Sequence, residues 1–141
     1  MEQLIEFAGK HVMLVAGFAG IILLLIWTEI SRYTRGYIEL TPLQAVQKIN
    51  QGRTSIVDIS TAADFSKGHL AGAKHIALSR FSKADADIEK MLKDSLLVVC
   101  KNGQTAHQAA AKLVKLGAQD VAVLKGGTTQ WIADQYPLVR Q

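Results

Sequence analysis

The sequence has few cysteines, prolines and aromatic residues. Of its 141 residues one is a cysteine, two are prolines and 6% are aromatic. A single cysteine excludes an intramolecular disulfide and any zinc site built from several cysteines. Two prolines beside 11 glycines exclude a collagen-like or linker-like chain. The length allows one ordinary domain with an appendage, rather than two full domains.

Charged residues are also sparse. They make up 20% of the chain, with a net charge of +4 and a mean hydropathy of +0.16, which argues against a disordered tail. The basic residues are scattered along the chain. A nucleic-acid groove requires a concentrated basic face with aromatic stacking platforms. We therefore expect no nucleic-acid partner.

The apolar residues are concentrated near the N-terminus. Residues 11–28 form a run of 18 residues without a formal charge, bracketed by Lys10 and Glu29. As a helix this run is about 27 Å long, close to the roughly 30 Å of a bilayer core. Residues typical of membrane interfaces lie at the end of the run, Trp27, and beyond it, Tyr33 and Tyr37. The pattern predicts one transmembrane helix at about residues 11–28, within an N-terminal region 1–37 that ends in a juxtamembrane linker.

Two other interpretations of the run compete with an anchor. Glu2 and Glu6 before the run, and the lack of a small-x-small cleavage site after it, disfavour a cleaved signal peptide. A buried core helix is disfavoured because no polar stripe interrupts the run. Arg32 and Arg35 follow it, and the positive side of a span faces the cytoplasm. We expect a single-pass inner-membrane protein with its N-terminus outside and its bulk in the cytoplasm.

Residues 38–141 have the pattern of an α/β domain. Short apolar segments predict strands at residues 55–59, 74–77, 96–99 and 121–124. Helical spacing, with a capping Thr and a Pro at the first start, predicts helices at residues 42–51, 62–67, 85–93, 105–116 and 128–134. Short strands alternating with helices predict a mostly parallel sheet flanked by helices.

The single cysteine is placed where such sheets bind ligands. Cys100 ends the clearest strand, and a short loop containing Gly103 leads into the next helix. Ligands gather beyond the carboxyl ends of parallel strands, and the free N–H groups of a helix start favour an anion. These amides are expected to stabilise a thiolate or a terminal sulfur attached to it. The alternative is a buried cysteine that fills space at a strand end.

Four segments of this region carry a family pattern. They are Cys100-Lys101-Asn102-Gly103-Gln104-Thr105, Val57-Asp58-Ile59, Asp64-Phe65 with Gly68-His69-Leu70-Ala71-Gly72-Ala73, and Leu124-Lys125-Gly126-Gly127 with Trp131. Together they resemble the rhodanese sulfurtransferases: the active loop, the first strand with its acid, the "E-F, then G-H-I-x-G-A" signature, and the closing "L-x-G-G, then W". With the anchor, the chain resembles the bacterial single-domain, membrane-tethered rhodaneses.

The resemblance implies a rhodanese-like fold and transfer of sulfane sulfur without a cofactor or metal. Cys100 would take sulfur from thiosulfate or a related small anionic donor, hold it as a persulfide, and pass it to an external thiol or protein acceptor. The outer sulfur would lie among the main-chain N–H groups of Lys101, Asn102, Gly103, Gln104 and Thr105. Asp58 would brace the loop. The predicted N-terminal helix adds the lipid bilayer as a partner, and a membrane protein is a further candidate partner.

The sequence departs from the family pattern at three positions. Many members carry Arg and Ser where this chain has Thr105 and Ala106, and Arg where it has Ser60. Losing the loop Arg removes a permanently charged donor, and a related phosphatase would need that Arg to clamp a phosphate. The alternative function is therefore a membrane-tethered rhodanese-fold interaction module with little or no activity.

Most of the other notable side chains are interpreted as structural. We expect His69 to be a hydrogen-bonded structural residue, His75 to be surface or loop packing, and Trp131 to be a core aromatic. His107 lies on the helix after Cys100, where a protonated ring would favour the thiolate. Lys101 would add a cation for an anionic donor. No set of His, Asp and Glu has metal-ligand spacing.

Overall fold

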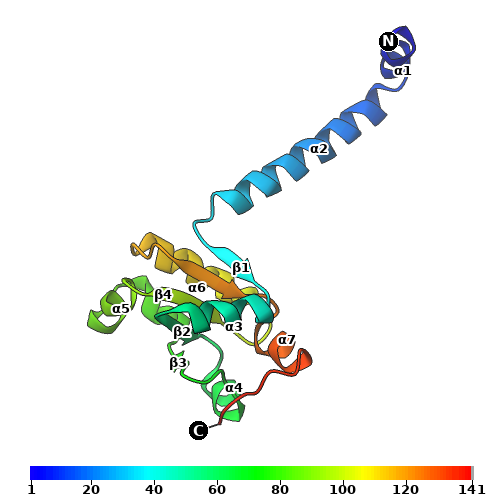
Figure 1. Cartoon of the computed structure of the whole chain (residues 1–141). Helices are drawn as coiled ribbons and strands as arrows, with labels where there is room; N and C mark the ends of the chain where they lie inside the picture. Colours follow the sequence, from blue (N-terminus) through cyan, green and yellow to red (C-terminus); the bar gives the residue numbers. More distant parts are fainter. Residues whose placement is uncertain (141) are drawn as a thin grey trace. The chain divides into compact units, whose positions relative to one another are not determined.

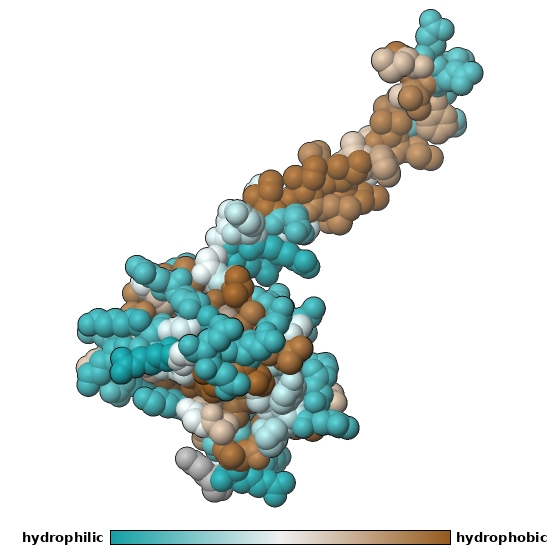
Figure 2. Space-filling view, in the orientation of Figure 1, coloured by the Kyte–Doolittle hydropathy of each residue, from teal (hydrophilic) through white to brown (hydrophobic). Residues whose placement is uncertain are grey.

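A computed structural model of the chain describes residues 1–140, in two compact units (Figure 1). The first unit, Met1–Arg35, contains helix α1 (Glu2–Lys10) and helix α2 (Val12–Tyr33). His11 separates them with φ −127° and ψ 47°. None of the residues of α2 is buried, and within residues 1–140 α2 is the one helix long and apolar enough to cross a membrane. Figure 2 shows an apolar surface along the middle of this unit, with hydrophilic side chains towards both of its ends.

The unit that begins at Gly36 is built on a five-stranded parallel sheet. The strands are β1 (Ile38–Leu40), β2 (Thr54–Asp58), β3 (Lys74–His75), β4 (Ser95–Val99) and β5 (Val121–Leu124). Their order is β1-β5-β4-β2-β3, and every pairing is parallel. The predicted α/β fold class is confirmed. β1 has no counterpart among the predicted strands, because a segment of three residues is too short to give a periodic signal.

The helices follow the strands much as the spacing predicts. They are α3 (Pro42–Gln51), α4 (Ala62–Lys67), the 3-10 helix η1 (Leu78–Ser82), α5 (Ala86–Met91), α6 (Gln104–Lys115) and α7 (Gly127–Ala133). α3 begins at a capping box, in which the Thr41 side chain accepts from the Gln44 N–H and the Gln44 side chain accepts from the Thr41 N–H. α5 is shorter than predicted: Asp85 caps it and Leu92 ends it.

Helices cover both faces of the sheet, so the unit has two cores. Alternation along β4 sends Leu96 and Val98 to one face and Leu97 and Val99 to the other. The first face packs against α5 and α6, and the second against α3 and α7. A strand buried on both faces has no polar side, which explains the uninterrupted apolar run of β4.

Candidate functional site

The carboxyl ends of three neighbouring strands meet beside Cys100. Cys100 directly follows β4, whose Val99 is paired with Asp58 at the end of β2. Gly126 and Gly127 follow β5 on the other side and begin α7. Because all three strands are parallel, the segments that leave them converge on one edge of the sheet. This is the edge at which the position of the cysteine predicts a ligand site.

The thiol is buried and receives a backbone hydrogen bond. Cys100 is 1% exposed, and the Gly103 N–H donates to its Sγ at 2.9 Å. Gly103 has φ +87° and caps the start of α6, a backbone conformation that favours glycine. Among the hydrogen bonds of residues 1–140, no other loop amide donates to Sγ, and the Gln104 N–H donates to Asn102 Oδ1 instead. The burial of Cys100 fits a cysteine that fills space, and the hydrogen bond to its Sγ fits a stabilised thiolate.

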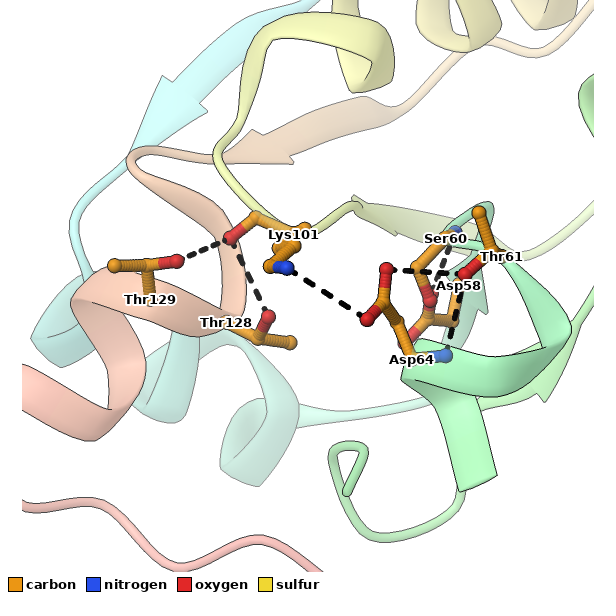
Figure 3. A network of polar contacts seen from close by, with 7 residues as sticks. All are labelled: Asp58, Ser60, Thr61, Asp64, Lys101, Thr128 and Thr129. Atoms are coloured by element: carbon orange, nitrogen blue, oxygen red, sulfur yellow. Dashed lines mark hydrogen bonds and ion pairs between the residues drawn. The ribbon is translucent and has the colours of Figure 1, made fainter. Parts of the chain in front are cut away.

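The start of α7 orients the loop. The Thr128 N–H donates to the Cys100 carbonyl and the Thr129 N–H to the Lys101 carbonyl, each at 3.0 Å. Both threonine hydroxyls also donate to the Lys101 carbonyl, at 3.3 and 2.8 Å (Figure 3). The free N–H groups of a helix start need acceptors, and the loop carbonyls supply them. The carbonyls of the first two loop residues are therefore held toward α7.

The close approach of the loop to α7 requires glycines. A Cβ on Gly127 would lie 2.1 Å from the Cys100 carbonyl oxygen and 2.8 Å from the Gly103 nitrogen. A Cβ on Gly103 would lie 2.8 Å from the Gly126 nitrogen. All three glycines also have positive φ. The Gly-Gly pair of the closing motif therefore works as a platform for the cysteine loop.

A second contact to the loop comes from α4. The Lys101 ammonium lies 3.7 Å from Asp64 Oδ1, while the Thr61 hydroxyl, which caps α4, donates to Asp64 Oδ2 at 3.0 Å (Figure 3). A hollow of about 280 Å³, here called the loop hollow, is lined by Ile59, Ser60, Thr61, Asp64, Leu78, Lys101, Asn102 and Thr105. Cys100 is not among the lining residues.

A hollow of about 740 Å³ lies beside Ser95 and Asp120, at the amino ends of β4 and β5. We place the site at the carboxyl edge, because the cysteine and the converging loops are there.

Asp58 is turned toward its own strand end rather than toward the loop. It is fully buried, and its Oδ1 accepts from the Ser60 N–H at 2.8 Å and from the Ser60 hydroxyl. Its Oδ2 has no hydrogen-bond partner within residues 1–140. The expected brace therefore does not take the form of a hydrogen bond from Asp58 to residues 100–105. The reason is that Ser60, two residues on, supplies both donors.

The histidines lie outside the loop. His69 is 5% exposed, stacks on Phe65 with ring centroids 3.8 Å apart, and makes a 2.9 Å hydrogen bond from Nδ1 to the Phe65 carbonyl. His107 contacts the Tyr37 hydroxyl and Glu39, on the side of β1. These contacts make His69 structural and leave the hypothesis of a His107 influence on the thiolate without a contact to support it.

The remaining aromatic and histidine follow expectation. Trp131 is buried, and its Nε1–H donates to the Pro137 carbonyl at 2.9 Å. His75 Nε2 lies 2.7 Å from the Ser60 carbonyl. Among residues 1–140 no group of three or more His, Cys, Asp and Glu side chains is placed to hold a metal ion.

Sequence reasoning missed the residues that hold the loop from outside. Thr128 and Thr129 carry no signal beyond their place at a helix start after Gly-Gly, and Asp64 is noticed only as a replacement for Glu. Which carbonyl a helix start binds, and which carboxylate a lysine reaches, depends on how the elements pack. These contacts therefore could not be read from spacing.

Comparison with known proteins points to one family. The Rhodanese-like domain family matches residues 41–134. The chain is 28% identical to the Escherichia coli protein YibN over 141 residues, which covers 99% of each. It is 39% identical over 98 residues to the thiosulfate sulfurtransferase GlpE of Pseudomonas putida, covering 70% of this chain and 86% of that one. A rhodanese-related protein of Thermoplasma volcanium has the same fold, with a TM-score of 0.63 at 22% identity, over 74% of this chain and all of that one.

Proposed function

The chain belongs to the rhodanese-like domain family, and on this premise we propose that it transfers sulfane sulfur through a persulfide on Cys100. The donor is thiosulfate or a related sulfur compound, and the acceptor is an external thiol or another sulfur-accepting nucleophile. A similar protein from Pseudomonas putida is a thiosulfate sulfurtransferase, which supports the reaction class. This chain has no second cysteine, so the acceptor thiol must come from outside it.

The proposed reaction has two steps with the same nucleophilic chemistry. The Cys100 thiolate attacks the outer sulfur of thiosulfate, the sulfur–sulfur bond of the donor breaks, and sulfite leaves with the bonding electrons. Cys100 then carries a persulfide. An acceptor thiolate next attacks the outer sulfur of that persulfide, so that the acceptor gains the sulfur and Cys100 returns as the thiolate.

The observation that carries the proposal is the 2.9 Å hydrogen bond from the Gly103 N–H to Sγ. An amide donor at the start of α6 favours a negatively charged sulfur over a neutral thiol. The carbonyls of Cys100 and Lys101 accept hydrogen bonds from α7. They therefore do not compete with Sγ for the Gly103 N–H. A cysteine that only filled space would not require this arrangement.

The decisive experiment is an intact-mass measurement on the full chain in detergent micelles. After incubation with thiosulfate, and separately with a small alkyl persulfide, we expect about 32 Da, one sulfur atom, to be added at Cys100. Cys100→Ser is the matched control and should gain nothing. Failure of every donor to give the adduct would reject the proposal.

A second candidate function is a tethered interaction module without catalysis. It is favoured by Thr105 and Ala106, since the loop has no permanently charged donor, and by the burial of Cys100 at 1% exposure. Replacing the chromosomal gene by a Cys100→Ser version distinguishes the two. A module predicts that this strain behaves as wild type while a deletion strain does not, and a sulfurtransferase predicts that both strains lose the function.

For the cellular location we propose that α2 spans the inner membrane once and holds the rhodanese-like domain in the cytoplasm. Support comes from its 22 residues, a mean hydropathy of 2.2 over its most apolar stretch, Arg32 in its last turn and Arg35 just beyond it. By this proposal the N-terminal region is residues 1–37 and the domain is residues 38–141. A C-terminal fusion to a reporter that folds only in the cytoplasm should be active, and one to a reporter active only outside should be silent. The reverse pattern would overturn the orientation.

A further inference from the structure

The loop hollow carries one cation and one anion, and these two groups face each other. Of its eight lining residues, Lys101 and Asp64 are the charged ones. Each is attached to a different element: Asp64 is held by the Thr61 hydroxyl at the start of α4, and the Lys101 carbonyl by Thr129 of α7 (Figure 3). Their separation of 3.7 Å is well inside the Debye length of about 8 Å, so an incoming ion meets the pair as a nearly neutral unit.

This pairing disfavours a doubly charged donor. Thiosulfate carries two negative charges, and residues 100–106 contain one cation, Lys101, and no Arg. An unpaired Lys101 would attract the dianion, whereas Asp64 repels it over nearly the same distance. The family's loop Arg, which would restore the positive balance, is replaced here by Thr105 and Ala106. The charges at the loop hollow therefore suit a donor that carries less negative charge at its sulfur end than the thiosulfate dianion.

Resting on the proposed function, we propose that Asp64 makes this site selective for a persulfide donor, R–S–SH, over thiosulfate. The Cys100 thiolate attacks the outer sulfur of the donor and the donor's sulfur–sulfur bond breaks. R–S⁻ leaves with the bonding electrons, and the proton remains on the transferred sulfur as Cys100–S–SH. No oxidant or reductant is consumed. Asp64 touches neither sulfur and acts through Lys101, as a specificity-determining residue.

The test measures charge selection at Cys100 without relying on catalysis. The full chain in detergent is alkylated with iodoacetate, an anion, and with iodoacetamide, which is neutral and of similar size. We expect Asp64→Asn to raise the ratio of the two rate constants about 2–5-fold, and Lys101→Gln to lower it by a similar factor, the range of an exposed ion pair. Asp87→Asn, an exposed aspartate on α5, is the control and should leave the ratio unchanged.

A second readout uses the sulfur adduct itself. Asp64→Asn should speed the formation of the adduct from thiosulfate relative to that from an alkyl persulfide by the same factor. If both ratios in Asp64→Asn equal those of wild type, the inference is wrong while the proposed function stands. If no donor gives an adduct in any variant, the proposed function fails, and the alkylation ratio alone still decides whether Asp64 sets the charge at the loop.

A different observation concerns α1, whose apolar face is uncovered. At 100° per residue, Glu2, Gln3, Glu6 and Lys10 gather on one side of the helix, where Glu6 and Lys10 form an ion pair of 2.7 Å. The other side carries Leu4, Ile5, Phe7 and Ala8, and the first two are more than 70% exposed. An amphipathic helix of this kind needs an apolar surface to cover one face.

From its continuity with α2 we infer that α1 lies in the interface of the lipid bilayer, apolar face inward. The charge-free part of α2, residues 12–28, is about 26 Å long, close to a bilayer core of about 30 Å, so α1 is not needed to complete the span. The non-helical His11 between them lets α1 leave the direction of α2. Short amphipathic helices bind the headgroup boundary in this way.

Single-cysteine labelling of the full chain tests this placement. In a Cys100→Ser background, Ala8→Cys places an environment-sensitive fluorophore on the apolar face and Gln3→Cys places it on the polar face. In phosphatidylcholine vesicles carrying nitroxide lipids, we expect strong quenching at position 8 and little at position 3. Equal quenching at both would show α1 inside the bilayer. No quenching at either would show that the apolar face is covered by protein. Each result would overturn the inference.

Discussion

The chemistry proposed for Cys100 depends on residues that carry no reactive group. Gly103 lets the loop turn so that its N–H reaches Sγ, and Gly127 lets α7 come close enough to bind the Cys100 carbonyl. A side chain at either position would clash with backbone atoms of the neighbouring segment. The thiol therefore depends on two backbone approaches that only glycine permits.

Gly127→Ala should collapse this arrangement. The added Cβ would lie 2.1 Å from the Cys100 carbonyl oxygen, at a φ of +59°, so the loop must move. We expect a loss of about 2–4 kcal/mol in the free energy of unfolding and a slower reaction of Cys100 with iodoacetamide. Thermal unfolding and alkylation kinetics measure the two effects.

Gly72→Ala is the matched control. Gly72 also has a positive φ, +81°, but nothing lies within 4 Å of its added Cβ. It should cost about 1 kcal/mol in backbone strain and leave the reactivity of Cys100 unchanged. Equal effects of the two substitutions on the thiol would show that the approach of α7 does not position the loop.

Asp120 gives the stability of the domain a pH dependence. The Lys48 ammonium donates to both carboxylate oxygens at 2.9 Å and holds the pKa of Asp120 below its ordinary value of 3.8. A lowered folded-state pKa stabilises the fold above 3.8, and this contribution is lost as the pH falls through the lower, folded value. Because the carboxylate is half exposed, solvent screening keeps the contribution small.

Comparing wild type with Asp120→Asn measures this contribution. Near neutral pH the variant should melt at a slightly lower temperature, and the difference should vanish as the pH is lowered toward about 2. Thermal unfolding of both proteins across this range checks the expectation. A difference that stays constant with pH would assign the effect of the substitution to packing instead of charge.

At the scale of elements, α7 contributes to the site through its first turn. Its N–H groups and two threonine hydroxyls take up the loop carbonyls, while Trp131 anchors the helix by packing and by its bond to the Pro137 carbonyl. α4 holds Lys101 from the opposite side through Asp64. The loop is thus fixed by two helices that come from different halves of the domain sequence.

Thr129→Val tests the contribution of α7. It removes the hydroxyl that donates to the Lys101 carbonyl at 2.8 Å and keeps the shape of the side chain. We expect a loss of about 0.5–1.5 kcal/mol in stability and a measurable change in Cys100 alkylation, since the loop is less firmly held. Thr129→Ser, which keeps the hydroxyl, should restore the wild-type rate. If the serine variant behaves like the valine variant, the hydrogen bond is not what matters.

At the scale of the whole molecule, the chain divides into two units with separate physical requirements. The cores on both faces of the sheet draw on residues of the second unit alone, from Tyr37 to Leu138. The first unit buries none of its helix residues, and its apolar surface needs a different environment. The packing of the domain core therefore uses no residue of the first unit.

A fragment of residues 36–141 should accordingly fold by itself. We expect it to stay in solution without detergent, to unfold cooperatively, and to show the same Cys100 alkylation rate as the full chain in micelles. Circular dichroism on heating and alkylation kinetics check this. An unfolded or aggregated fragment would show that the first unit contributes to the stability of the domain.

The sequence by itself determined the class of the fold, the parallel strands and the location of the cysteine. Continuous apolar runs such as 96–99 are local signals of strands buried on both faces, and a cysteine at the end of such a run must lie at the carboxyl edge. The family motifs then identified the loop. All of these follow from spacing within short segments.

Only the tertiary structure decided how the loop is held. It showed that Asp58 turns to Ser60, that Asp64 faces Lys101, that His107 contacts β1, and that α7 binds the loop carbonyls. It also added the edge strand β1, which at three residues is too short to be recognised alone. The physical reason is that these contacts join segments far apart in the chain, so their partners are selected by packing and not by spacing.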